Sequence, residues 1–133
     1  MKTVIAFFAV LAMIFVSVPV FSQTWHTTNQ ATVAWDAVTV PSGTVSYKVY
    51  IKPEVGGTET LVTTVTTTQA TITFAEEGRY FTGVSTVRTV NSVPIESSTI
   101  SWSNIASVCQ NGVTFGIQYY IPPSAPVGLR RIP

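Results

Sequence analysis

Short segments in which apolar and polar residues alternate limit the fold of this chain more than any other feature. The clearest is Val45–Ile51, where Val, Tyr, Val and Ile occupy one set of alternate positions and Ser, Lys and Tyr occupy the other. Successive side chains of a β-strand point to opposite faces, so this pattern predicts a strand with one apolar face. No helical period occurs after residue 22. The sequence therefore predicts an all-β fold.

Turn residues separate the alternating segments from one another. The predicted strands are Ala31–Trp35, Val45–Ile51, Thr58–Thr67, Ala70–Phe74, Tyr80–Val90 and Val113–Ile121. Glycine, proline, serine and asparagine gather between them, as in Pro41-Ser42-Gly43 and Gly56-Gly57, which is turn chemistry. About six or seven short strands, each with one apolar face, need two sheets packed face to face. We expect a two-sheet sandwich.

The first 22 residues have the composition of a secretory signal peptide. Lys2 precedes an apolar run from Val4 to Val18, Pro19 ends the run, and Ser22 offers a cleavage position. A retained membrane anchor is the alternative, but a spanning helix needs roughly 20 apolar residues and this run is shorter. We therefore expect a signal peptide over 1–22, a domain over 23–121 and a Pro-rich tail over 122–133, in a protein that is secreted or periplasmic.

The charge balance excludes several kinds of partner. The whole chain has seven basic and six acidic side chains, and removal of Lys2 with the leader leaves six of each. Such a domain offers no basic face for nucleic acid and no polybasic run for a membrane surface after cleavage. A near-neutral surface rich in Thr and Ser leaves self-association open.

Residues that could support catalysis are few. Beyond the leader the chain has one His (His26), one Asp (Asp36) and one Cys (Cys109), so neither a nucleophile with its base nor a metal-ligand cluster can be assembled. Glu76-Glu77 could be taken for a paired carboxylate site, but neighbours on a tight turn point apart into water. We expect no catalytic, cofactor-binding or metal-binding residues and no enzyme activity.

Four elements in sequence order resemble a fibronectin type III domain. They are the Trp strand Ala31–Asp36, the Tyr strand Tyr47–Ile51, the corner Glu77–Val84, and the pair Glu96-Ser97-Ser98 and Trp102-Ser103-Asn104. The resemblance spans 31–104 and implies an immunoglobulin-like sandwich that acts through contact rather than chemistry. The core candidates are Trp35, Tyr47, Ile72, Phe74 and Tyr80. The Tyr80 hydroxyl is expected to meet backbone near the preceding turn.

The chain departs from that family at two places. The strand that usually precedes the Trp strand has no counterpart in Gln23–Gln30, whereas the tail from Pro122 to Pro133 resembles such a linker and first strand. The tail is either a plain terminus, the start of a following module, or an edge strand over Val127–Ile132 that pairs with its own domain or a neighbouring copy. Donation to a neighbour would build a filament. The second departure, Ile105–Gly112, contains an Asn111-Gly112 hairpin signal and is either an added hairpin or a long loop.

The candidate contact residues are aromatic, because Tyr and Trp combine large area with a polar group. They are Tyr50, Trp102, Tyr119 and Tyr120, each with sheet packing as the alternative. Cys109 cannot form an intramolecular disulfide, so it is either an inert thiol or a link between two copies. The sequence thus predicts an exported module for protein or glycan contact or extracellular structure, with a self-assembling fibre subunit and a polysaccharide-associated accessory domain as alternatives. The leader and the absence of glycosylation acceptors favour a bacterial source.

Overall fold

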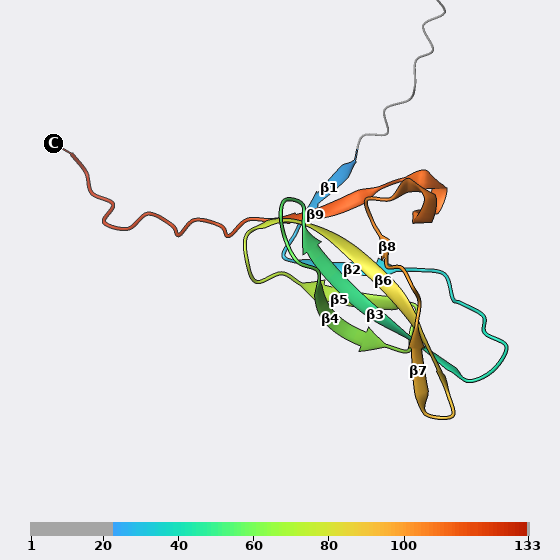
Figure 1. The fold of residues 1–133 in the computed structure, drawn as a ribbon. Coiled ribbons are helices and arrows are strands. Elements are labelled where there is room, and N and C mark those ends of the chain that lie inside the picture. Colours follow the sequence, from blue (N-terminus) through green and yellow to red (C-terminus); the bar gives the residue numbers. More distant parts are fainter. Residues whose placement is uncertain (1–22, 133) are drawn as a thin grey trace, which may run out of the picture.

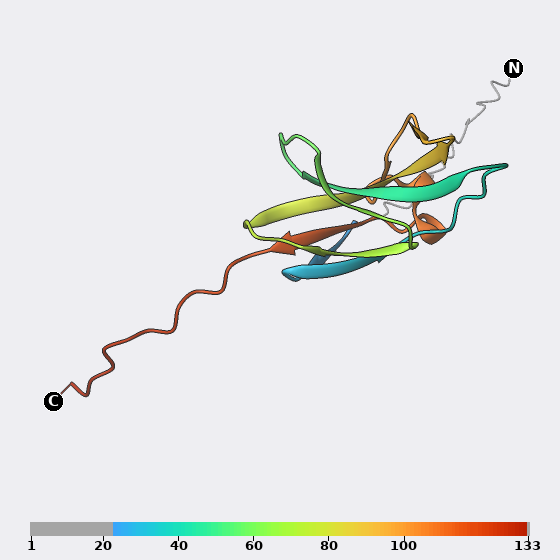
Figure 2. The same cartoon turned by 90° about the horizontal axis from the view of Figure 1, so that it is seen from below.

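The computed structural model describes residues 23–132 and consists of two β-sheets packed against each other, with no α-helix in that range (Figures 1 and 2). The all-β, two-sheet prediction is confirmed. The expected signal peptide over 1–22 lies outside the described residues. The strands are β1 Thr24–Thr27, β2 Gln30–Ala34, β3 Thr44–Pro53, β4 Thr60–Val65, β5 Gln69–Thr73, β6 Gly78–Val90, β7 Val93–Glu96, β8 Ser101–Trp102 and β9 Phe115–Tyr119.

The larger sheet has seven strands and is organised around β6. Its order is β1-β9-β6-β3-β4, and β7 and β8 pair with β6 on the side opposite β3. All of these pairs are antiparallel except β1 with β9, which is parallel. The 13-residue β6 is long enough to pair in turn with β9, β8 and β7 along one edge. The sequence does not predict the three short strands β1, β7 and β8, so the structure has more strands than expected.

The smaller sheet contains only β2 and β5, paired antiparallel from Gln30↔Thr73 to Ala34↔Gln69. Its inward side chains meet those of β3, β6 and β9 in the core. The fully buried residues Val49 and Ile72 lie at the centre, each with no exposed surface. The remaining buried members of this cluster are Val33, Ala70, Phe74 and Ile117.

Three of the five predicted core residues are buried, and two lie at its margin. Tyr47, Ile72 and Phe74 are buried, whereas Trp35 and Tyr80 are partly buried and pack against the core. Trp35 meets the Tyr47 ring edge-on at 5.4 Å between centroids. The Tyr80 hydroxyl donates a hydrogen bond to the Glu76 carbonyl at 3.0 Å, as predicted. The interior is therefore centred on aliphatic side chains rather than on Trp35.

The segment between β8 and β9 forms a loop rather than an added hairpin. It contains two short 3₁₀ turns, Ala106–Val108 and Gln110–Gly112. Asn111 and Gly112 have positive φ values of 55° and 70°, the left-handed backbone that this dipeptide favours. The hairpin signal thus predicted the local backbone, but Val113 is not in a strand and the flanking residues do not pair.

After β9 the chain leaves the sandwich. Residues 120–132 have no regular secondary structure, are exposed, and extend away from both sheets (Figures 1 and 2). Val127 and Leu129 are 96% and 101% exposed. The tail does not pair with the edge of its own domain.

Candidate functional site

The four candidate contact residues do not form one surface. Tyr50 and Trp102 belong to the larger sheet, on the face turned away from β2 and β5. Tyr119 packs against the core, and Tyr120 is 53% exposed at the start of the tail. Trp102 is only 7% exposed, so it is a packing residue rather than an exposed contact residue.

Three aromatic rings lie on the outer face of the larger sheet, and two of them lie over glycines. We call Trp25, Phe81 and Trp102 the aromatic layer. A Cβ atom at Gly83 would lie 2.6 Å from the Trp102 ring, and one at Gly116 would lie 2.5 Å from the Trp25 ring. Such approaches are shorter than packed carbon atoms tolerate, so both rings require glycine beneath them.

Two cations cover the aromatic layer. The Lys52 Nζ lies 4.2 Å from the centre of the Trp102 ring, and the Arg79 guanidinium lies 4.6 Å from that of Trp25. The Trp25 and Phe81 centroids are 5.5 Å apart. A cation over an indole face is attracted by the ring quadrupole. Because Lys52 and Arg79 already occupy the exposed faces, the layer is a packing feature and leaves little aromatic surface free for a ligand.

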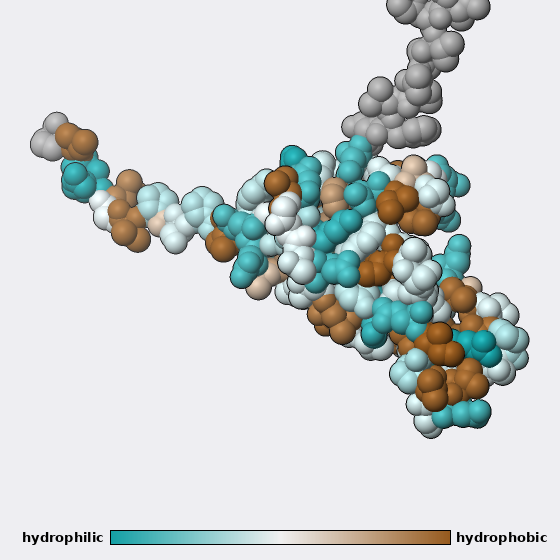
Figure 3. Space-filling model, viewed as in Figure 1, coloured by the Kyte–Doolittle hydropathy of each residue, from teal (hydrophilic) through white to brown (hydrophobic). Residues whose placement is uncertain are grey.

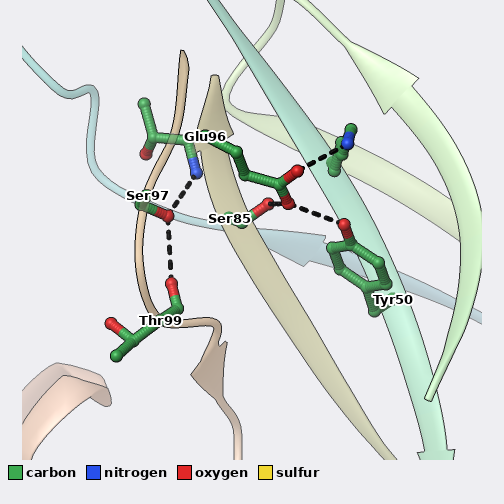
Figure 4. Close-up of polar contacts among 7 residues, drawn as sticks. Tyr50, Ser85, Glu96, Ser97 and Thr99 are labelled. Carbon is green, nitrogen blue, oxygen red and sulfur yellow. Dashed lines mark hydrogen bonds and ion pairs between the residues drawn. The ribbon is translucent and has the colours of Figure 1, made fainter. Parts of the chain in front are cut away.

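Glu96 gathers three hydrogen-bond donors at the edge of the same face (Figure 4). Its carboxylate accepts from Lys48 Nζ at 2.5 Å, Ser85 Oγ at 2.6 Å and the Tyr50 hydroxyl at 2.7 Å. The hydrogen bonds from Lys48, Ser85 and Tyr50 lower the pKa of Glu96 from 4.5 to about 2. These hydrogen bonds connect β7 to β3 and β6. The hydroxyl of Tyr50, a candidate contact residue, is therefore already bonded to Glu96 of the same domain.

Replacing Glu96 by Gln is expected to lower the free energy of unfolding by about 1 kcal/mol at pH 7, a modest loss because the side chain is partly exposed. The folded-state pKa is below the ordinary value, so the carboxylate stabilises the fold above pH 4.5 and loses this effect as the pH falls through about 2. Urea unfolding of both proteins between pH 2 and 7 measures the difference. A gap that stays constant across this range would contradict the assignment.

A groove of about 810 Å³ lies between the two sheets on the free side of β2. One wall is β2 and its continuation to Asp36, and the other is formed by β6 and β8. The loop 107–110 and the residues Val113 and Phe115 complete it. The apolar side chains Val33, Trp35, Val84, Val113 and Phe115 line it together with serine and threonine. The groove is open and contains no cluster of reactive groups.

The edge of β2 along this groove has unpaired backbone groups. The Asn29 carbonyl accepts from Phe74 N at 2.8 Å, and Trp35 N donates to the Thr68 carbonyl at 3.0 Å. Hydrogen bonding alternates along an antiparallel strand, so the N–H and C=O groups of Thr32 and Ala34 point away from β5. Within 23–132 no strand other than β5 pairs with β2. The groove is therefore bordered by a strand edge that can accept another strand.

One side-chain donor beside this edge also lacks a partner. The Trp35 Nε1 is buried, and no acceptor among the described residues lies within hydrogen-bond distance. A buried donor without a partner destabilises the fold, and most such groups are satisfied by protein or by water. The Trp35 indole thus lines the groove with its ring while its Nε1 stays buried against the protein.

Cys109 lies in the wall of the groove and faces the protein. Its Sγ is 3.3 Å from the Ser103 carbonyl, to which the thiol donates. Burial raises the pKa of the Cys109 thiol above its usual value. A higher pKa keeps the sulfur protonated and slows its reaction with a second thiol. The predicted intermolecular link through Cys109 remains a prediction, and this environment does not favour it.

The remaining titratable residues include an ion pair between Arg79 and Glu54, whose Nη1 and Oε2 atoms are 3.5 Å apart. His26 meets the Phe115 ring edge-on, Asp36 lies at the end of the groove, and the Glu77 carboxylate accepts a hydrogen bond from Ile121 N at 2.5 Å. Among residues 23–132, no group of three His, Cys, Asp or Glu side chains could hold a metal ion. In the same range no helix is long and apolar enough to cross a membrane.

Comparisons with known proteins give no relative for this chain. No protein-family model, no curated protein and no solved structure matches it.

Proposed function

We propose that this protein is an exported, non-catalytic contact module, related to fibronectin type III domains, that binds an extended polypeptide segment by adding it to the edge of β2. The observation that carries this proposal is the free edge of Thr32 and Ala34 beside an apolar groove. A strand added to an exposed edge gains backbone hydrogen bonds for affinity, and its alternate side chains enter pockets that give specificity.

The groove has the composition that such a segment requires. Val84, Val113 and Phe115 offer apolar surface to the inward side chains of the added strand. The outward N–H and C=O groups of Thr32 and Ala34 can form the backbone hydrogen bonds to the added strand. Native sandwiches usually cover, charge or shorten their edge strands to prevent pairing. β2 carries no charged residue over its length. Its edge therefore lacks the charges that would prevent another strand from pairing with it.

Thr32→Pro tests this function with little effect on the domain itself. The Thr32 N–H points away from β5, so proline removes a donor needed by the added strand but no backbone hydrogen bond within the β2–β5 pair. The side-chain hydrogen bond between the Thr32 and Thr71 hydroxyls, 2.9 Å long, is lost. We expect residues 23–133 to enrich extended, alternating peptides from a displayed decapeptide library, and Thr32→Pro to lose that enrichment by at least about tenfold.

Thr32→Val is the matched control, because it also loses the hydrogen bond to the Thr71 hydroxyl but keeps the backbone N–H. It should enrich the same peptides as the unaltered protein. Circular dichroism of each variant verifies that the sandwich is retained. Enrichment that is equal in Thr32→Pro and Thr32→Val would show that binding does not use the β2 edge, and no enrichment by the unaltered protein would remove the proposal.

A further inference from the structure

Residues 126–132 of the tail have the residue pattern of a β-strand but pair with no other strand of the described residues. Val127 and Leu129 alternate with Gly128 and Arg130, so an extended tail presents two apolar side chains on one face. Both apolar side chains are fully in solvent, and Figure 3 shows brown, hydrophobic side chains along the tail, away from the sandwich. Contiguous exposed apolar surface often marks an interaction site. Burying Val127 and Leu129 requires a groove outside the tail.

The same protein has a sheet that lacks a strand. The smaller sheet ends at β2, whose edge is free, and the adjoining groove of about 810 Å³ is lined by apolar side chains. We propose that residues 126–132 of a second copy of this chain fill that groove and pair with β2. This inference rests on the proposed function and names its partner.

The geometry favours a second copy over the tail of the same molecule. The end of β9 lies beside the start of β2, because Thr28 N donates to the Gln118 carbonyl at 3.0 Å. To reach its own edge, the tail would reverse immediately after Tyr119. Pro122 and Pro123 fix φ and favour an extended backbone at that point. The hydrogen bond from Ile121 N to Glu77 holds the start of the tail to its own domain.

The direction of the added strand follows from these positions. A tail that enters at the Trp35 end of β2 and runs toward Gln30 is antiparallel to β2 and continues the antiparallel order of the smaller sheet. Val127 and Leu129 then face Val84 and Phe115 across the groove, while Gly128 and Arg130 face solvent. Gly128 has a φ of 74° in the free tail, and glycine passes readily from this conformation to an extended one.

This contact joins the tail of one copy to the groove of the next. The two surfaces are different parts of the molecule, so the contact is heterologous, and each copy retains a free groove or a free tail. Unless the rotation between copies closes a ring, the product is an open chain. The near-equal numbers of acidic and basic side chains provide little repulsion between copies.

Residues 23–133 are expected to form oligomers whose mass rises with concentration in size-exclusion chromatography with light scattering. Removal of 122–133 should leave a folded monomer, since residues 122–132 make no hydrogen bond to the sandwich. Leu129→Asn should weaken association at least about tenfold, because it places a polar group in the groove. Arg130→Asn, the matched change on the solvent side, should not. An oligomer that survives the truncation, or equal effects of the two variants, would contradict the inference.

Disulfide trapping identifies the strand that is paired. In a Cys109→Ser background, a protein with Thr32→Cys and a separate protein with Arg130→Cys should form a mixed disulfide on mild oxidation, because both side chains point away from the groove. Thr58→Cys in place of Thr32→Cys is the control and should trap far less. Equal trapping by Thr32→Cys and Thr58→Cys would exclude pairing at β2.

Peptide binding separates this inference from the proposed function. A synthetic peptide of residues 122–132 should bind the truncated domain and compete with full-length association. If the truncated domain binds library peptides through β2 but not this peptide, the tail is not the partner and the strand-binding function stands. If it binds neither, both proposals fail.

Discussion

Replacing Trp102 by alanine is expected to lower the free energy of unfolding by about 3 kcal/mol, within the range for truncated buried aromatic residues. The indole is 7% exposed, lies on the backbone of Gly83 and is covered by Lys52. Its removal leaves a cavity on the outer face and exposes the β6–β8 pair. Urea unfolding followed by circular dichroism measures the loss without depending on tryptophan fluorescence.

The control for this change is Tyr120→Ala. Tyr120 is also an aromatic contact candidate from the sequence, but it is 53% exposed, and its replacement should change stability by less than about 0.5 kcal/mol. If Trp102→Ala were as stable as Tyr120→Ala, Trp102 would be a surface residue that is free to bind a partner. That result would overturn its assignment to the packed outer face.

Replacing Ile72 by alanine is expected to lower the free energy of unfolding by about 3–4 kcal/mol, in the middle of the range for an aliphatic core residue. Ile72 lies at the centre of β5 with no exposed surface and belongs to the cluster around Val49. The smaller sheet has only two strands, so few neighbours can move in to fill the space. A domain of this size is stabilised by only about 5–15 kcal/mol, and the variant should therefore unfold at a clearly lower temperature.

Ile95→Ala removes the same atoms from an exposed site and is the matched control. Ile95 is 55% exposed on β7, so its truncation should cost less than about 1 kcal/mol. Equal losses in the two variants would mean that Ile72 is not at the centre of the core. A smaller loss in Ile72→Ala than in Ile95→Ala would reject the packing of the two sheets described above.

The alternation of apolar and polar residues predicted the long strands correctly but did not predict the short ones. Val45–Ile51 and Ala70–Phe74 alternate clearly. The first lies within β3, and the second differs from β5 by one residue at each end. The short strands β1, β7 and β8 carry too few residues to establish a period, and they form because β6 and β9 offer edges to pair with. Strand pairing therefore depends on neighbours that are distant in sequence.

The most informative residues of the outer face were missed for the same reason. Phe81 and Val87 are buried, although they alternate with the core-facing Thr82 and Val84 of β6, because the central strand is covered on both faces. The Glu96 cluster joins residues from β3, β6 and β7 that are up to 48 positions apart. The alternation of Gly83 with larger residues was the available signal, since a glycine within a strand often lies beneath a bulky side chain.

By itself the sequence determined an all-β sandwich, the approximate strands, the Tyr80 corner and a tail with the composition of a strand, because these depend on local alternation and turn chemistry. Only the tertiary structure decided that Trp102 is packed, that Tyr50 is bound to Glu96, and that the edge of β2 is free beside an open groove. Burial and pairing are properties of segments brought together by folding. No single segment of the chain contains that information.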